Sequence, residues 1–418
     1  MSSYLDLNLE LTPTQTALKE ETHRFAKEVI RPASIALDKL ADPEDVIRDG
    51  SVYWDVFRKH YELGRHLAAF PEELGGANLR GLESHIVSEE MGWGAADFAI
   101  GLGASGSPYA MGLMAATMLG KQRLMDDVVL PYVHDKEAKY VGCWAITEPQ
   151  HGSDCAMAFM PEYASDPKTS FDTHARRDGD DWLISGAKSA WVSNGTVATH
   201  AMLHFAIDRS KGMGASGIAV VPLNLPGVSK GKPLNKLGQR ALNQGEVYFD
   251  EVRIPNDYVV VETEMYPMVG DMILAGANSS MGATFTGVAR AAYEEAMAYC
   301  KQRVQGGKPI CEHQLVQRKL FDMFTKVEAA RYLSRAAVIY NSATMPPVSR
   351  YSVAAKVFCT EVAFEVASDA VQLLGGYGLS KEFLVEKLFR DARASMIEDG
   401  ANDVLALGGA WHLINSFQ

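Results

Sequence analysis

The chain has 418 residues, of which 47% are apolar and 22% are charged, so its core needs no disulfides or structural metal. Asp and Glu number 52 against 40 Lys and Arg, and the net charge of −12 argues against nucleic acid or an anionic membrane as the main partner. No run of 18 apolar residues predicts a membrane span, and the acidic start has no targeting pattern. Five scattered cysteines predict reduced thiols and a cytoplasmic location.

The first third of the chain is predicted to be helical. Pro13 follows Thr12 at a plausible first helical turn, and apolar residues then recur every three or four positions. Leu82 to Met91 is a second helix candidate. Ile100 to Met118, rich in Gly, Ala and Met, is typical of a buried helical segment. We therefore expect an N-terminal helical domain over residues 1–139.

The residue pattern changes near Tyr140, where runs of Trp, Thr and Val are interrupted by Gly, Asn, Asp and Pro. Strands are predicted at Trp182–Ile184, His200–Ile207, Ile218–Pro222 and Glu246–Ile254. They do not alternate with helices, so residues 140–262 should form an antiparallel barrel or sandwich rather than a Rossmann unit. Gly212 to Gly217 matches GxGxxG, but a strand-like run follows it, which favours a hairpin turn over a dinucleotide loop.

Helical periodicity returns in residues 263–418. Long helices are predicted at Ala291–Arg303, Gln314–Tyr340, Arg350–Leu374 and Lys381–Asp391. The fold class is thus α+β with three domains in the order helical, β, helical. The 11 histidines show no metal-ligand spacing, so no metal site is expected.

Three short stretches could carry chemistry. Thr147 to Asp154 (TEPQHGSD) places hydroxyls and small residues in a loop that could hold a polar ring, although a plain turn would look the same. Trp191 to Gly195 (WVSNG) could stack a Trp on an aromatic cofactor, although most Trp residues are core. Ile397 to Asn402 (IEDGAN) pairs two carboxylates before a Gly, where one could be a general base or both could be solvated.

In this order and at these spacings, the three stretches resemble the acyl-CoA dehydrogenase family. Further matches are Leu11 to Pro32, Phe70 to Gly76, Gly238 to Pro255, Gly307 to Gln314 and Gln372 to Arg393, so the resemblance covers nearly the whole chain. It implies an N-terminal helical domain, a middle β domain and a C-terminal four-helix bundle. It also implies bound FAD, an acyl-CoA substrate, a homotetramer or less often a dimer, and an electron-transferring flavoprotein as acceptor.

The resemblance also assigns residues by position. Substrate contacts fall on Ser153, Asn278 and Gly400. Cofactor contacts fall on Ile146, Thr147, Ser153, Trp191, Ser193, Arg303, Gln314, Gln372, Gly375 and Gly376, of which the last five would reach the FAD of a neighbouring subunit. The base would remove the α-proton while the β-hydrogen leaves as hydride to the flavin.

The base position departs from the family pattern. The family commonly has Tyr-Glu-Gly-Thr where this chain has Glu398, Asp399, Gly400 and Ala401, so Asp399 takes the place of the catalytic Glu with about 1.5 Å less reach. Asp403 also differs from the usual Gln. Asn278 replaces a common Arg, and Gly306 replaces a common aromatic residue.

These departures leave three alternatives open. The base could instead be Glu398, the neighbouring carboxylate. It could also be Asp97, because relatives acting on cyclic acyl groups can use an aspartate, in some cases from the N-terminal domain. An Asp base also resembles the nitroalkane oxidases, but Ala406 stands where those enzymes would have an Arg. A redox-inactive relative is the third possibility. We expect an FAD-dependent acyl-CoA dehydrogenase with an unusual, cyclic or branched, acyl group.

Overall fold

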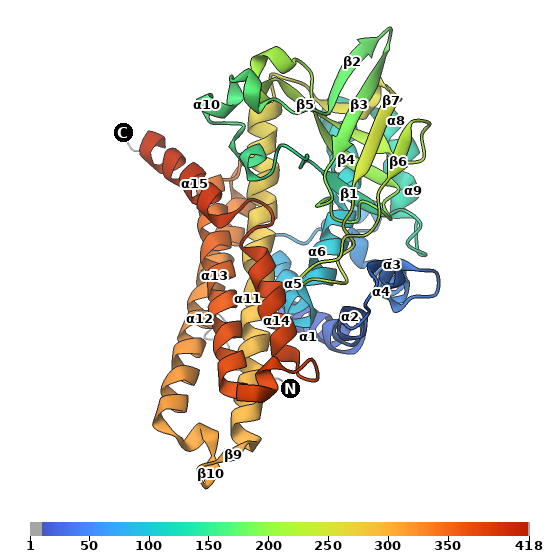
Figure 1. The fold of residues 1–418 in the computed structure, drawn as a ribbon. Coiled ribbons are helices and arrows are strands. Elements are labelled where there is room, and N and C mark those ends of the chain that lie inside the picture. The colour runs from blue at the N-terminus through green and yellow to red at the C-terminus, as the bar shows by residue number, and fades with distance from the viewer. Residues whose placement is uncertain (1–10, 417–418) are drawn as a thin grey trace.

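The computed structural model describes residues 11–416. Its N-terminal part is helical, as predicted (Figure 1). Thr12 caps the first helix by accepting a hydrogen bond from the N–H of Gln15, whose side chain accepts from the N–H of Thr12. The targeting expectation falls mostly on residues 1–10, outside the described residues. The helices are α1 Pro13–Phe25, α2 Arg31–Asp38, α3 Pro43–Ile47, α4 Val52–Glu62, α5 Gly81–Gly94, α6 Ala96–Ser105, α7 Ser107–Leu119, α8 Gln122–Leu124 and α9 Leu130–Val133.

The middle part holds one eight-stranded sheet in the order β6-β7-β3-β2-β4-β5-β8, with β1 paired to β4. Its strands are β1 Gly142–Ala145, β2 His174–Asp178, β3 Asp181–Lys188, β4 His200–Ala206, β5 Ser216–Pro222, β6 Val228–Lys230, β7 Val247–Pro255 and β8 Val259–Val261, and the short helix α10 spans Pro161–Ala164. All four strands predicted from the sequence are present.

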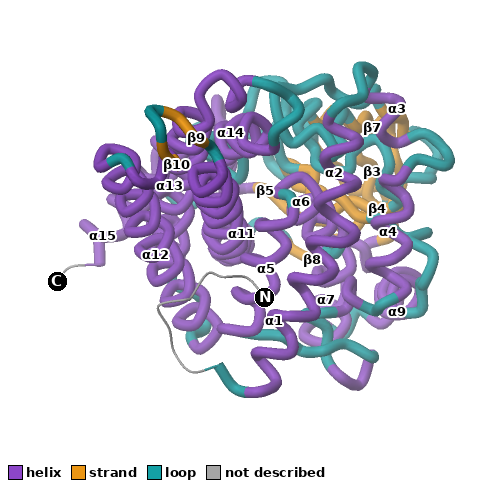
Figure 2. Tube along the Cα trace, turned by 90° about the horizontal axis from the view of Figure 1, so that it is seen from below, coloured by secondary structure: helices purple, strands orange, loops and turns teal. Residues whose placement is uncertain are grey.

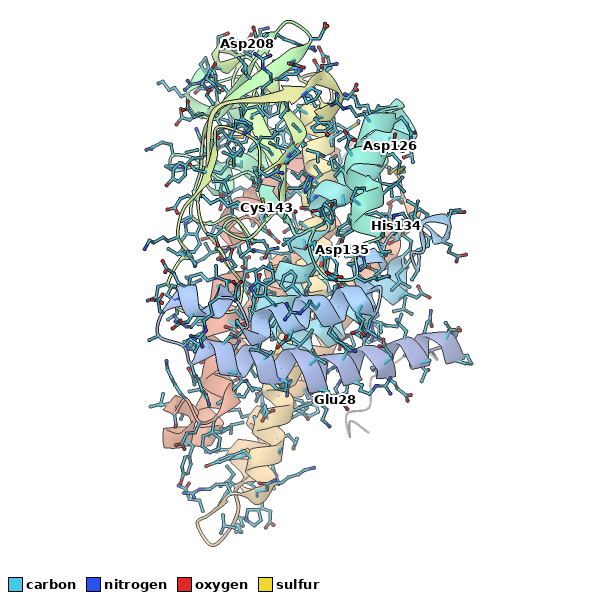
Figure 3. The ribbon with its side chains drawn as sticks, turned by 90° about the vertical axis from the view of Figure 1, so that its right-hand side faces the viewer. Glu28, Asp126, His134, Asp135, Cys143 and Asp208 are labelled. Atoms are coloured by element: carbon cyan, nitrogen blue, oxygen red, sulfur yellow. The ribbon has the colours of Figure 1, made fainter. Side chains whose placement is uncertain are left out.

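Two strand pairs correct the expectation of a purely antiparallel sheet, because β1 and β2 both lie parallel to β4. A parallel neighbour requires a long crossover connection, and the chain between β1 and β4 supplies one that contains β2 and β3. The GxGxxG segment connects the antiparallel strands β4 and β5, which confirms a turn. Figure 3 shows Asp208, beside this turn, at the outer end of the β domain.

The C-terminal part is the predicted four-helix bundle, formed by α11 Tyr266–Gln302, α12 Gln314–Ala343, α13 Ser349–Leu374 and α14 Leu384–Ser395. A small hairpin, β9 Val304–Gln305 and β10 Lys308–Pro309, joins α11 to α12, and α15 Asn402–Ser416 follows the bundle. Seen from below, the bundle lies beside the N-terminal helices (Figure 2).

Helix α11 begins 25 residues before the Ala291 start predicted from the sequence. Its first half contains many Gly, Ser and Asn residues and packs against both α5 and α13, which hides an amphipathic pattern. Gly287 permits this contact, because a Cβ there would lie 2.0 Å from the carbonyl oxygen of Glu89. Gly92 on α5 is equally confined by Thr284. The close α5–α11 contact joins the N-terminal helices to the bundle.

A buried ion network fixes the same junction. Arg290 of α11 donates to Glu89 and Glu90 of α5 at 2.8 Å each, and Arg331 of α12 donates to Glu89 at 3.0 Å. Each buried charge is paired, as burial requires. All five cysteines are unpaired, as predicted. Within residues 11–416, no helix is long and apolar enough to cross a membrane.

Candidate active site

A cavity of about 1010 Å³ lies where the helical parts meet the β domain. Its walls come from α6, the loop after β1, the loop after β3, the loop before β7, the first half of α11 and the loop between α14 and α15. The sequence-predicted residues that line it are Ile146, Thr147, Ser153, Trp191, Ser193, Glu398, Asp399 and Gly400. Segments more than 250 residues apart in the chain thus supply one site.

One wall suits a planar aromatic ring. Trp191 is 59% exposed and lines the cavity, which is unusual for a side chain that normally buries its area. Beside it, Ser193 accepts from Gln244 at 3.4 Å. Thr147 accepts from Ser189 at 3.0 Å, so its own hydroxyl proton remains available to a ligand. A stacking surface edged by hydroxyls fits the isoalloxazine ring of a flavin.

A buried ion pair holds the Thr147 loop in place. Lys188 donates to Glu148 at 2.7 Å and to the carbonyl of Ile146 at 3.0 Å. Glu148 also accepts from the N–H groups of Asp172 and Thr173. Both side chains are fully buried, and their many partners satisfy them. The Glu of the TEP motif therefore positions the loop through these bonds.

Opposite this wall, Asp399 presents a carboxylate on a strained loop. Its φ is 52° and that of Gly400 is 95°, and left-handed backbone at a non-glycine residue is typical of functional sites. Within residues 11–416 the Asp399 carboxylate makes no hydrogen bond or ion pair. Burial raises its pKa, and Lys356 opposes that rise. The carboxylate is therefore free to bond a ligand and is a stronger base than an exposed Asp.

Two contacts hold the Asp399 loop. Lys356 of α13 donates to the carbonyl of Gly400 at 2.7 Å and to Asn402 at 2.8 Å. Ser153, from the segment after β1, accepts from the N–H of Ala401 at 2.9 Å. Burial lowers the pKa of Lys356 to about 8, against the attraction of Asp399. The loop is thus fixed from both the bundle and the β domain.

Glu398 also lines the cavity but is already bonded. It accepts from the amide of Gln239 at 2.5 Å. Burial raises the pKa of Glu398 to about 7, with Gln239 and Lys236 opposing and Asp399 reinforcing the rise. Lys236 itself donates to the carbonyl of Leu242 and to Gln244. The Gln239 bond ties Glu398 to the β domain and reduces its freedom to reach a substrate.

Two predicted residues are buried in the protein without lining the cavity. Asp97 is fully buried, accepts from Lys387 at 3.1 Å and from Ser34 at 2.8 Å, and does not line the cavity. These partners stabilise its charge within the protein, which favours a structural role for Asp97 over that of the base. Asn278 is also fully buried and donates to the carbonyl of Leu274 in its own helix, so the structure does not bring it to a ligand.

The remaining predicted cofactor residues lie at the other end of the bundle, near the β9–β10 hairpin (Figure 1). None of them lines the cavity; they are Arg303, Gln314, Gln372, Gly375 and Gly376. All five are exposed. The Arg303 guanidinium lies 5.8 Å from the ring centre of Tyr377, which follows the two glycines. Within one chain these residues cannot contact a ring bound beside Trp191.

Several cavity residues were missed by sequence reasoning. They are Trp144, His204, Gln239, Lys236 and Tyr266. Gln239 lies in the Gly238 to Pro255 match, which assigned it no role, and no local motif marks the other four. The one available signal is the presence of Trp144 three residues before Thr147, next to the recognised motif.

The cavity thus brings together an exposed Trp, flanking hydroxyls and an unpaired carboxylate, groups that suit an enzyme with an aromatic cofactor and a general base. The family models of the acyl-CoA dehydrogenase N-terminal, middle and C-terminal domains match residues 12–129, 143–252 and 274–411. The chain belongs to the acyl-CoA dehydrogenase family. It is therefore an FAD-dependent enzyme, and its reaction class is the dehydrogenation of acyl-CoA thioesters.

Relatives match over almost the whole chain. The mitochondrial short-chain specific acyl-CoA dehydrogenase of Rattus norvegicus is 30% identical over 98% of this chain and 92% of its own. The cyclohexane-1-carbonyl-CoA dehydrogenase of Geobacter metallireducens is also 30% identical, over 93% of this chain and 94% of its own. The structure of butyryl-CoA dehydrogenase from Megasphaera elsdenii aligns with a TM-score of 0.83 at 27% identity, covering 98% of this chain and all of that one.

Proposed function

We propose that this enzyme oxidises a cyclic or branched acyl-CoA thioester and that Asp399 is the base that removes the α-proton. The observation that carries the proposal is the Asp399 carboxylate, which lines the cavity and has no protein partner within residues 11–416. The similarity to a dehydrogenase named for cyclohexane-1-carbonyl-CoA supports the cyclic acyl group.

The short side chain of Asp399 supports a bulky acyl group. An Asp reaches about 1.5 Å less than a Glu, and a displacement of about 1 Å can slow a reaction about 100-fold. A substrate must therefore bring its α-carbon closer to the loop. A ring or a branch fills the extra space between the loop and the stacking wall, whereas an unbranched chain leaves it empty.

The chain's own groups can carry out the proton step. The Asp399 carboxylate accepts the α-proton, and burial favours this by raising its pKa. The N–H groups of Asp399 and Gly400 have no partner within residues 11–416, so they are available to a thioester carbonyl, where charge develops as the proton leaves. Bound FAD supplies the hydride acceptor for the β-hydrogen. Trp191, Thr147 and Ser193 would hold its ring.

The test is an anaerobic panel of thioesters mixed with the holoenzyme, with flavin bleaching as the measurement. Cyclohexane-1-carbonyl-CoA and isobutyryl-CoA should reduce the flavin at least about tenfold faster than butyryl-CoA, because the short base penalises a straight chain. Faster bleaching by butyryl-CoA would refute the acyl-group proposal. Bleaching by nitroethane but by no thioester would favour the nitroalkane oxidase alternative, and no bleaching at all would favour a redox-inactive relative.

We further propose that the enzyme works as a homo-oligomer, a tetramer rather than a dimer, and passes its electrons to an electron-transferring flavoprotein. Exposed Arg303, Gln314 and the Gly375–Gly376 turn lie too far along the bundle to serve the cavity of their own chain. Large apolar side chains are exposed at the same end, including Leu315 at 87% and Leu379 at 78%. A subunit interface would cover these apolar side chains and bring Arg303, Gln314 and the Gly375–Gly376 turn to the cofactor of a neighbouring subunit.

A further inference from the structure

A chain of three hydrogen-bonded side chains, two of them buried and one half-buried, forms part of the cavity wall and has no role in the steps above. Trp144 of β1 donates from Nε1 to Nε2 of His204, on β4, at 2.9 Å. The other ring nitrogen of His204, Nδ1, lies 2.9 Å from the hydroxyl of Tyr266, the first residue of α11. His204 and Tyr266 are each 1% exposed, and all three residues line the cavity.

The order of the donors in this chain is fixed. An indole N–H can only donate, so Nε2 of His204 must be the acceptor. Burial keeps the pKa of His204 well below its ordinary value, so the imidazole is neutral and carries its single proton on Nδ1. That proton is donated to the Tyr266 oxygen. Burial also keeps the pKa of Tyr266 high, so its O–H is retained.

The hydroxyl proton of Tyr266 therefore has no acceptor within residues 11–416, although the residue is buried. A buried donor without a partner is costly, and such groups in native proteins call for an explanation. Because Tyr266 lines the cavity, a bound ligand can supply the missing acceptor.

The position of Tyr266 indicates which part of the ligand it meets. Leu274 packs with Leu405, which follows the Asp399 loop, so the reacting carbon belongs near this level of α11. Tyr266 lies eight residues earlier, about 12 Å along the helix axis. It is too far away to bond the thioester carbonyl.

The two ends of the cavity also differ in polarity. Beyond Leu274 the cavity passes the apolar side chains of Ile100 and Met281, which suits the acyl group. His151 lies near Tyr266, because both rings pack on Phe171, and Asp271 lines the cavity between Tyr266 and Leu274. The polar carrier arm of the thioester, with its amides, therefore belongs at the Tyr266 end.

We propose that the Tyr266 hydroxyl donates a hydrogen bond to an amide carbonyl of the pantetheine arm of the substrate, and that Trp144 and His204 hold its proton in that direction. The proposal deepens the proposed function and rests on it, since it assumes a thioester carried on coenzyme A. It assigns a substrate-binding role to Tyr266 and a positioning role to Trp144 and His204, none of which the sequence analysis gave a role.

The test uses free coenzyme A and pantetheine, which contain the arm without any acyl group, and measures their binding to the FAD-loaded enzyme by titration calorimetry. Tyr266→Phe removes only the hydroxyl and should weaken both ligands about 3- to 10-fold, the effect of one hydrogen bond. In steady-state assays with acyl-CoA, the KM of the Tyr266→Phe variant should rise. Its kcat, the rate at saturation, should be retained, because the lost contact is remote from the chemistry. Tyr258→Phe is the control, since that hydroxyl bonds Asp127 away from the cavity.

A second variant tests the relay itself. Trp144→Phe frees Nε2 of His204, so the ring proton can move there and Nδ1 can accept from Tyr266, which turns the hydroxyl proton away from the ligand. This variant should bind coenzyme A as weakly as Tyr266→Phe does. The double variant should lose no more affinity for coenzyme A than either single variant. A flavin spectrum matching the parent confirms that each variant keeps its cofactor.

The outcomes separate the two proposals. Equal affinity of the parent and Tyr266→Phe for coenzyme A would overturn the inference while leaving the dehydrogenase reaction intact. Additive losses in the double variant would overturn the relay. A parent holoenzyme that binds neither coenzyme A nor pantetheine would overturn both this inference and the thioester substrate on which it rests.

Discussion

Replacing Lys356 by Met should slow flavin reduction strongly without emptying the cofactor site. Lys356 donates to the carbonyl of Gly400 and to Asn402 at 2.7 and 2.8 Å and is fully buried. Hydrogen bonds from a charged group contribute about 1.5–3 kcal/mol each, so these two restrain the Asp399 loop by about 3–6 kcal/mol. A shift of about 1 Å costs about 100-fold in rate, or about 2.7 kcal/mol. The lost restraint is large enough to allow that shift.

The same substitution should change the pH dependence. The base acts in its deprotonated form, so activity is lost on the acid side as pH falls through its pKa. Burial raises the pKa of Asp399 above its ordinary value and the Lys356 charge lowers it. Removing that charge should raise the pKa further, and the acid limb of the rate profile should move to higher pH.

The assay is stopped-flow flavin reduction between pH 5 and 9 under single-turnover conditions. Lys319→Met is the control, because Lys319 of α12 pairs with Asp369 of α13, the helix that carries Lys356, without lining the cavity. It should leave both the rate and the acid limb unchanged. An acid limb that stays in place in Lys356→Met, or that moves to lower pH, would refute the reasoning.

Three further predictions concern the surroundings of the site. Ser193→Ala should weaken FAD binding by about 0.5–1.5 kcal/mol, the value of one hydroxyl hydrogen bond, and unchanged flavin retention in a dilution assay would remove Ser193 from the cofactor site. Asp97→Asn should lower the free energy of unfolding by about 3 kcal/mol, because it breaks a buried pair with Lys387, and should leave the rate of flavin reduction unchanged. Unchanged stability in urea unfolding, together with loss of flavin bleaching, would indicate that Asp97 is the base. Arg303→Ala should make FAD content depend more steeply on protein concentration, and sedimentation of a fully flavinated monomer would contradict a site shared between subunits.

The sequence predicted the domain order and four of the strands in the middle sheet, because alternating hydrophobicity is a local property. It placed the start of α11 too late, since the glycines and serines before Ala291 lower the helix propensity, and Gly287 is there because of close contact with α5. The parallel pairing of β1 with β4 was also missed, because the register depends on partners 58 residues apart.

The site was predictable where short motifs carry it. Thr147, Trp191, Ser193 and Asp399 were found from three local stretches, and all line one cavity. The role of Asp97 could not be judged, because its partner Lys387 lies 290 residues away. The Trp144–His204–Tyr266 chain could not be predicted from local motifs either, since its hydrogen bonds join three elements that are far apart in the sequence.

The most direct test of the account is a comparison of Asp399→Asn with Glu398→Gln in single-turnover flavin bleaching by one common thioester. Asp399→Asn removes the basic oxygen at nearly constant shape, so it should retain FAD and bind coenzyme A but reduce its flavin at least about 100-fold more slowly than the parent. Glu398→Gln should slow the reaction far less, because Gln239 already occupies that carboxylate. Reduction of Asp399→Asn within about threefold of the parent rate, with Glu398→Gln inactive, would place the base on Glu398 and contradict the account.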